Sequence, residues 1–79
     1  MEKEHSLENG VQPLDALMTA EGLDNHALVA SSTEQITHKM VAKARSGRWL
    51  NKSIRLKILR AYCKATGQER ALGELFNYD

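Results

Sequence analysis

Apolar residues recur at helical spacing along most of this 79-residue chain, and no segment shows the alternation expected of a half-buried strand. One apolar stripe crosses residues 13–21, a second leads up to Arg45, and a third crosses residues 54–65. Their members are Leu14, Leu17 and Met18, then Ile36, Met40, Val41 and Ala44, then Ile54, Ile58, Ala61, Tyr62 and Ala65. The pattern predicts an all-α fold, a compact bundle of about five short helices.

Residues with special backbone behaviour set the ends of the first two helices. Pro13 suits the first helical position, where its missing N–H costs nothing, and Gly22 suits a left-handed stop. These two residues predict a first helix over about 13–21. Asp24 or Asn25 can cap a short second helix.

The next two helices have similar signals. A third helix is expected from about residue 34 or 37 to Arg45, because Ser46 and Gly47 then interrupt the pattern. Asn51 or Ser53 can cap a fourth helix, and Gly67 supplies its stop.

The core is expected to draw on all of these segments. The residues predicted to be buried are Leu28, Ile36, Val41 and Leu50. A short last helix over about 69–76 either completes the core or forms a dimer surface with Leu72, Leu75 and Phe76. Trp49 is expected to pack over the corner between the third and fourth helices.

The length of the chain favours one domain. A polar, acidic stretch is interpreted as a flexible N-terminal arm over residues 1–12, and the domain is placed at 13–79. The single cysteine, Cys63, excludes an internal disulfide and is expected in core or boundary packing. Apolar runs are too short for a membrane span, and the N-terminus lacks the apolar segment of a signal peptide. We therefore expect a cytoplasmic protein that does not enter a membrane.

The charges of the chain are strongly segregated although the formal net charge is only +1. No acidic residue lies between Glu34 and Glu69, while nine basic residues do. They are Lys39, Lys43, Arg45, Arg48, Lys52, Arg55, Lys57, Arg60 and Lys64. A positive patch built by helices is typical of a surface that binds nucleic acid. Since four of these residues spread around the fourth helix, not all nine can face one duplex.

A short helix, a connection and a second helix with a basic outer face form the layout of a helix-turn-helix. The stretch from Gly22 to Val29 resembles the junction of helices 1 and 2 in lambda-repressor-like, or Cro/repressor-type, domains. The stretch from Met40 to Arg48 is similar to the end of that family's recognition helix, which closes on Gly-Arg. The resemblance covers roughly residues 13–67 and implies a DNA-binding domain.

The connection before the third helix departs from that family. The family's turn is short and holds a glycine, whereas residues 30–35 form a longer connection without one. Glu34 and Gln35 therefore lie either in the turn or in the first turn of the third helix.

The resemblance implies a set of contacts to double-stranded DNA. Thr37, His38 and Lys39 match the base-reading start of the third helix, and Lys43 follows one turn later. Asn25 matches a phosphate-binding residue that opens helix 2. The loop before the fourth helix, with Arg48, Asn51 and Lys52, matches one that runs along the DNA backbone. A small transcriptional regulator that binds its site as a possible homodimer follows from these assignments.

Other readings of the same residues remain open. The chain could be a protein-interaction module such as an antitoxin, or a helical RNA-binding domain, although aromatic platforms for bases are few. The basic stretch could also be a solvated surface. We expect no enzyme activity, small-molecule substrate or cofactor, because no nucleophile–base motif or phosphate loop is present. We also expect no metal site, since His26, His38 and Cys63 lack ligand-like spacing.

Overall fold

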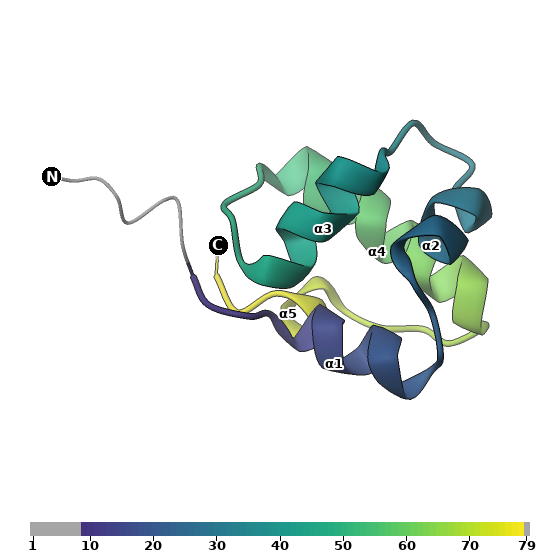
Figure 1. The fold of residues 1–79 in the computed structure, drawn as a ribbon, viewed down its shortest axis with the longest axis horizontal. Helices are drawn as coiled ribbons and strands as arrows, with labels where there is room; N and C mark the ends of the chain where they lie inside the picture. The colour runs from purple at the N-terminus through teal and green to yellow at the C-terminus, as the bar shows by residue number, and fades with distance from the viewer. Residues whose placement is uncertain (1–8, 79) are drawn as a thin grey trace, which may run out of the picture.

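Five helices make up the regular structure of the protein, as a computed structural model shows for residues 9–78 (Figure 1). They are α1 (Pro13–Ala20), α2 (Asn25–Ser31), α3 (His38–Ser46), α4 (Lys52–Thr66) and α5 (Leu72–Leu75). Residues 9–78 contain no strand, so the prediction of a small all-α bundle is confirmed. The last helix is shorter than the expected 69–76, because α5 begins only at Leu72.

Side-chain caps fix where α2, α3 and α4 begin. Asp24 Oδ1 accepts a hydrogen bond from the Ala27 backbone at 2.8 Å, so Asp24 and not Asn25 caps α2. Thr37 caps α3 through its hydroxyl, and Asn51 rather than Ser53 caps α4 through its amide oxygen. At their other ends α3 and α4 stop at glycines in the left-handed conformation, Gly47 and Gly67.

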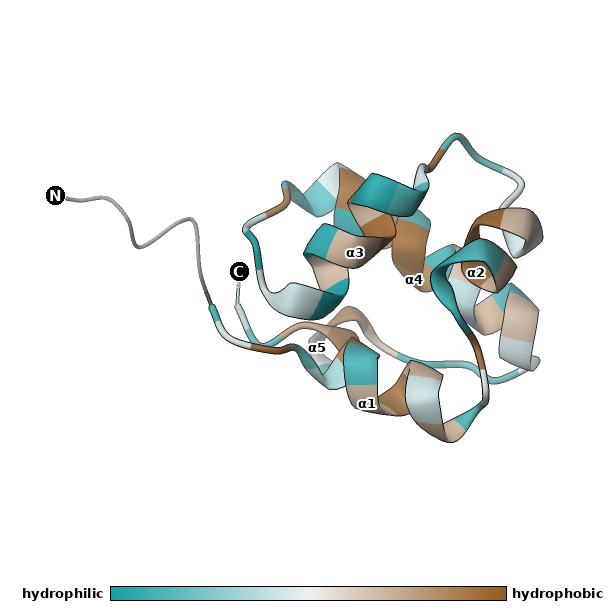
Figure 2. Ribbon diagram, viewed as in Figure 1, coloured by the Kyte–Doolittle hydropathy of each residue, from teal (hydrophilic) through white to brown (hydrophobic). Residues whose placement is uncertain are grey.

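The core lies between α4 and the helices that pack on it (Figure 2). α4 contacts α2, α3 and α5, and α1 closes the bundle through contacts with α3 and α5. The predicted core residues Leu28, Ile36, Val41 and Leu50 are all buried. Leu75 and Phe76 are buried too, so the last helix completes the core. Trp49, expected to pack over the α3–α4 corner, keeps 45% of its surface exposed.

Residues 9–12, which the sequence placed in the N-terminal arm, lie against the helical domain. The Asn9 backbone donates to the Gly47 carbonyl at 2.8 Å, and the Gln12 backbone donates to the Arg45 carbonyl at 3.0 Å. The Gln12 side chain is buried, and its Oε1 accepts a hydrogen bond from the Asn77 backbone at 2.7 Å. The two ends of the described chain therefore meet beside the end of α3 (Figure 1). Residues 1–8 of the predicted arm lie outside the described residues.

The connection between α2 and α3 spans residues 32–37, so Glu34 and Gln35 belong to the turn and not to α3. The Glu34 carboxylate accepts two hydrogen bonds from Arg60 of α4, at 2.5 Å from Nε and 2.7 Å from Nη2. Ser32 closes the turn from inside, because its hydroxyl accepts from the Glu34 N–H and donates to the Glu34 carbonyl. The two hydrogen bonds from Arg60 to Glu34, called the Glu34–Arg60 fork below, hold the long turn against α4 immediately before α3 begins.

The Glu34–Arg60 fork predicts a measurable titration change. The hydrogen bond from Arg60 lowers the pKa of Glu34, helped by the positive charges of Arg60 and Lys57. Because folding lowers the pKa of Glu34, the fork stabilises the protein at pH values above the pKa of Glu34 in the unfolded chain. This contribution is lost as the pH falls through the pKa of Glu34 in the folded protein. We expect Arg60→Gln to return the Glu34 pKa toward its ordinary value in a carboxyl-carbon NMR titration.

Arg70→Gln is the matched control, because Arg70 pairs with Glu74 at 3.7 Å and not with Glu34. It should leave the Glu34 titration where it is. A Glu34 curve that does not move in Arg60→Gln would contradict the role given to the fork.

Candidate nucleic-acid interface

One face of α3 is exposed and carries only polar, basic or small residues. The exposed positions are His38, Lys39, Ala42, Lys43 and Ser46, whereas Val41 and Ala44 on the opposite side are buried. This spacing is the regular two-sided pattern of a helix that packs on a core with one face. Lys39 and Lys43 lie one turn apart on the exposed face. The small side chains of Ala42 and Ser46 lie beside them and keep the helix surface low there.

The predicted residues at the start of α3 already have partners within the protein. Thr37 Oγ1 accepts a hydrogen bond from the Met40 backbone at 3.1 Å, which fixes the first turn of the helix. His38 Nε2 lies 3.3 Å from Nδ1 of His26, on the first turn of α2. The structure thus brings together two histidines that the sequence separates, and His26 was not among the predicted site residues. The spacing of residues along the sequence does not predict this contact, because the contact depends on how α2 and α3 cross.

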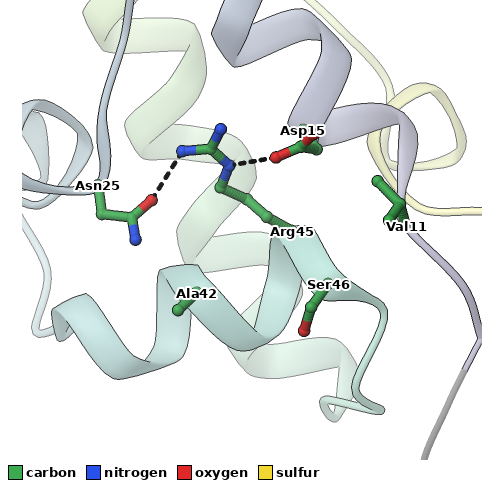
Figure 3. A pocket seen from close by; sticks show the side chains of 6 residues that line it. All are labelled: Val11, Asp15, Asn25, Ala42, Arg45 and Ser46. Carbon is green, nitrogen blue, oxygen red and sulfur yellow. Dashed lines mark hydrogen bonds and ion pairs between the residues drawn. The ribbon is translucent and has the colours of Figure 1, made fainter.

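Asn25 takes part in a second contact between helices. Arg45 of α3 donates from Nη1 to Asn25 Oδ1 at 2.9 Å and from Nε to Asp15 Oδ1 of α1 at 2.7 Å (Figure 3). This bridge joins the starts of α1 and α2 to the end of α3. It crosses a shallow depression of about 300 Å³ lined by Val11, Asp15, Asn25, Ala42, Arg45 and Ser46. The Arg45 charge is therefore used within the fold.

The remaining predicted residues lie in the loop between α3 and α4 and at the first position of α4. Arg48, Asn51 and Lys52 are all exposed. The amide oxygen of Asn51 caps α4, because it accepts a hydrogen bond from the Ile54 backbone N–H at 2.9 Å. Tyr78 fixes the loop from the C-terminal side, because its hydroxyl accepts from the Leu50 N–H at 3.1 Å and lies 3.3 Å from the Arg48 carbonyl oxygen.

Some basic residues of α4 bind other groups of the protein, and others face the solvent. Arg55 is 3% exposed and donates to the Leu50 and Tyr78 carbonyls, each at 3.0 Å. Its guanidinium also lies over the Tyr78 ring, 4.7 Å from the centroid. Arg60 is engaged by Glu34, while Lys64 is exposed and Lys57 half-buried. The charge count in the sequence therefore overstates the basic surface, because Arg45, Arg55 and Arg60 serve the fold.

Comparisons with family models, with curated proteins and with solved structures return no match for this chain. No helix within residues 9–78 is both long and apolar enough to cross a membrane. In the same range no three side chains of the metal-binding types cluster together, and Cys63 lies half-buried on α4.

Proposed function

We propose that the protein binds double-stranded DNA in a sequence-specific manner, as a small transcriptional regulator that inserts α3 into the major groove. The observation that carries this proposal is the exposed face of α3, with Lys39 and Lys43 on one side of a helix whose other side is core. A major groove admits one α-helix, and lysines at helical spacing reach both phosphates and acceptor atoms on bases. The low surface at Ala42 and Ser46 allows the backbone of α3 to approach the base edges.

The surroundings of α3 support the same reading. α2, the turn and α3 have the order of a helix-turn-helix of the Cro/repressor type, with a longer turn than that family usually has. In the proposed complex Thr37, His38, Lys39 and Lys43 meet base edges. Asn25, Arg48, Asn51 and Lys52 meet the phosphate backbone. Two acids on the elements around this surface are offset, since Asp15 pairs with Arg45 and Glu34 pairs with Arg60, while Asp24 stays exposed at the α2 cap.

A fluorescence titration of labelled duplexes at several salt concentrations tests the proposal. If about six phosphates are neutralised, log K should fall with log salt at a slope of roughly −5. A selection of bound duplexes from a random pool would then supply the preferred site, and a palindromic site would indicate a homodimer. Competition with structured RNA separates the RNA-binding alternative. Absence of any duplex binding at low salt would rule the proposal out.

Lys39→Ala is the substitution that separates base reading from phosphate contact. We expect its affinity for the selected site to fall by roughly tenfold, because one specific base contact is worth about 1–3 kcal/mol. Its affinity for random DNA should fall much less. Lys64→Ala, which removes an exposed lysine from the last turn of α4, is the matched control and should change both affinities little. An equal loss on both duplexes would assign Lys39 to a phosphate instead.

A further inference from the structure

The contact between His26 and His38 deepens the proposed function and rests on it. We propose that the two histidines act as one unit that takes up a single proton when the protein binds DNA, and that the protonated pair donates to acceptor atoms of the duplex. His26 is then a positioning residue for His38. The acceptor is a phosphate oxygen or the acceptor edge of a guanine.

The geometry of the two rings identifies how they interact. Their planes are 14° apart, which would also fit face-to-face stacking. However, the ring centroids are 5.4 Å apart while Nδ1 of His26 and Nε2 of His38 are 3.3 Å apart. The difference is about twice the distance from a ring centre to its nitrogen, so each nitrogen points almost directly at the other ring. The rings therefore meet edge to edge, in a nearly common plane, through an N–H···N hydrogen bond.

This bond limits the protonation states of the pair. One proton must lie between the facing nitrogens, and two would repel each other. In the neutral pair the outer nitrogens, Nδ1 of His38 and Nε2 of His26, are one donor and one acceptor, whichever tautomer holds. With one proton added, both outer nitrogens become donors. A second added proton breaks the contact between α2 and α3.

Charged groups of both signs lie on the elements around the pair, and a bound duplex adds negative charge. α2 has only its cap Asp24 as a charged group, and α3 carries Lys39, Lys43 and Arg45, which pairs with Asp15 of α1. α4, which packs against both helices, carries Lys52, Arg55, Lys57, Lys64 and Arg60, which pairs with Glu34. Asp24 lies two residues before His26 and uses one carboxylate oxygen in the α2 cap. Lys39 directly follows His38. A phosphate adds negative charge beside the pair. A phosphate or a guanine acceptor would accept from the outer N–H that the added proton creates, and this hydrogen bond favours uptake of the proton from the solvent.

Duplex affinity measured between pH 6 and pH 8, at constant ionic strength, tests the proposal. Uptake of one proton makes the affinity rise up to about tenfold for each pH unit that the pH falls. His38→Gln removes the ring at the start of α3 and should abolish this pH dependence, and the double variant should match it. His26→Gln leaves the ring of His38 without its partner and should reduce the dependence. His5→Gln replaces the third histidine, which lies outside the described residues, and should keep it. Thermal melts confirm that each variant is folded.

The two possible acceptors give different results. A phosphate contact makes the affinity for every duplex depend on pH, whereas a guanine contact does so only for the selected site. A wild-type affinity that does not change with pH would overturn the proposal, and so would a His26→Gln variant that keeps the full dependence. Both results would leave the proposed DNA binding intact.

A measurement on the free protein separates this inference from the proposed function. In NMR titrations of the rings, His38→Gln should change the titration curve of His26, and His26→Gln should change that of His38, because the pair titrates as a unit. The curve of His5 should not move. Independent curves for His26 and His38 would overturn the proposal even without DNA.

Discussion

Gly47→Ala is expected to destabilise the protein by about 3 kcal/mol, a large part of the stability of a domain this small. Gly47 ends α3 with φ +95°, where an L side chain is strained by about 1–2 kcal/mol. An added Cβ would also lie 1.8 Å from the Gly10 carbonyl oxygen, so the backbone there must move. That movement breaks the hydrogen bonds that Asn9 and Gln12 make with Gly47 and Arg45, at about 1 kcal/mol each.

Gly67→Ala is the matched control for this substitution. Gly67 ends α4 with φ +72°, yet nothing lies within 4 Å of its added Cβ. It should cost only the backbone strain, so the two melting temperatures should differ by roughly 10 °C. Hydrogen exchange of the Gln12 backbone amide shows where the structure changes, because its protection should be lost in Gly47→Ala and kept in Gly67→Ala. Equal melting temperatures would show that the contact with Gly10 is easily relieved.

Arg55→Ala is the second large effect that we expect, about 3 kcal/mol or more. The change removes two hydrogen bonds from a charged donor and leaves the Leu50 and Tyr78 carbonyls without those partners. It also removes the cation from the Tyr78 ring and opens space beneath the C-terminal residues. Urea unfolding would measure the loss. Lys52→Ala, at the exposed start of the same helix, should stay within about 0.5 kcal/mol of the wild type.

Tyr78→Phe resolves the role of the C-terminal residues more finely. The substitution keeps the ring below Arg55 but removes the hydroxyl that accepts from the Leu50 N–H. We expect a loss of about 1 kcal/mol in the free energy of unfolding.

If Arg55→Ala and Lys52→Ala had equal effects on the free energy of unfolding, the buried contacts of Arg55 would contribute nothing to stability.

The helix ends could be predicted because they depend on local chemistry. Pro13 opens α1, where its missing N–H is not needed, and Gly67 ends α4 with a positive φ that glycine adopts readily. Each stands where the sequence placed it. The cap of α4 was narrowed to two candidates, and Asn51 proved to be the one whose side chain reaches the backbone. The length of the turn before α3 was also visible, although its register was settled only by the position of Thr37.

The basic residues were harder to assign, because their count does not say where they point. Arg55 looked like one more surface charge, but it lies one turn before Ile58 and two before Tyr62, both buried. That spacing places Arg55 on the apolar face of α4 and could have identified it as buried. Arg45 and Arg60 gave no such signal. Their acids, Asp15 and Glu34, are distant in sequence and meet them only through the packing of helices.

The contact between Gln12 and Asn77 has a consequence for the topology of the chain. Since the two ends of the described segment are held by a 2.7 Å hydrogen bond, a short peptide joining residue 78 to residue 9 would close the domain into a ring with little distortion. Such a ring would have fewer unfolded conformations to lose on folding. It would leave no end near Gly47 to fray, while the exposed face of α3 kept its composition.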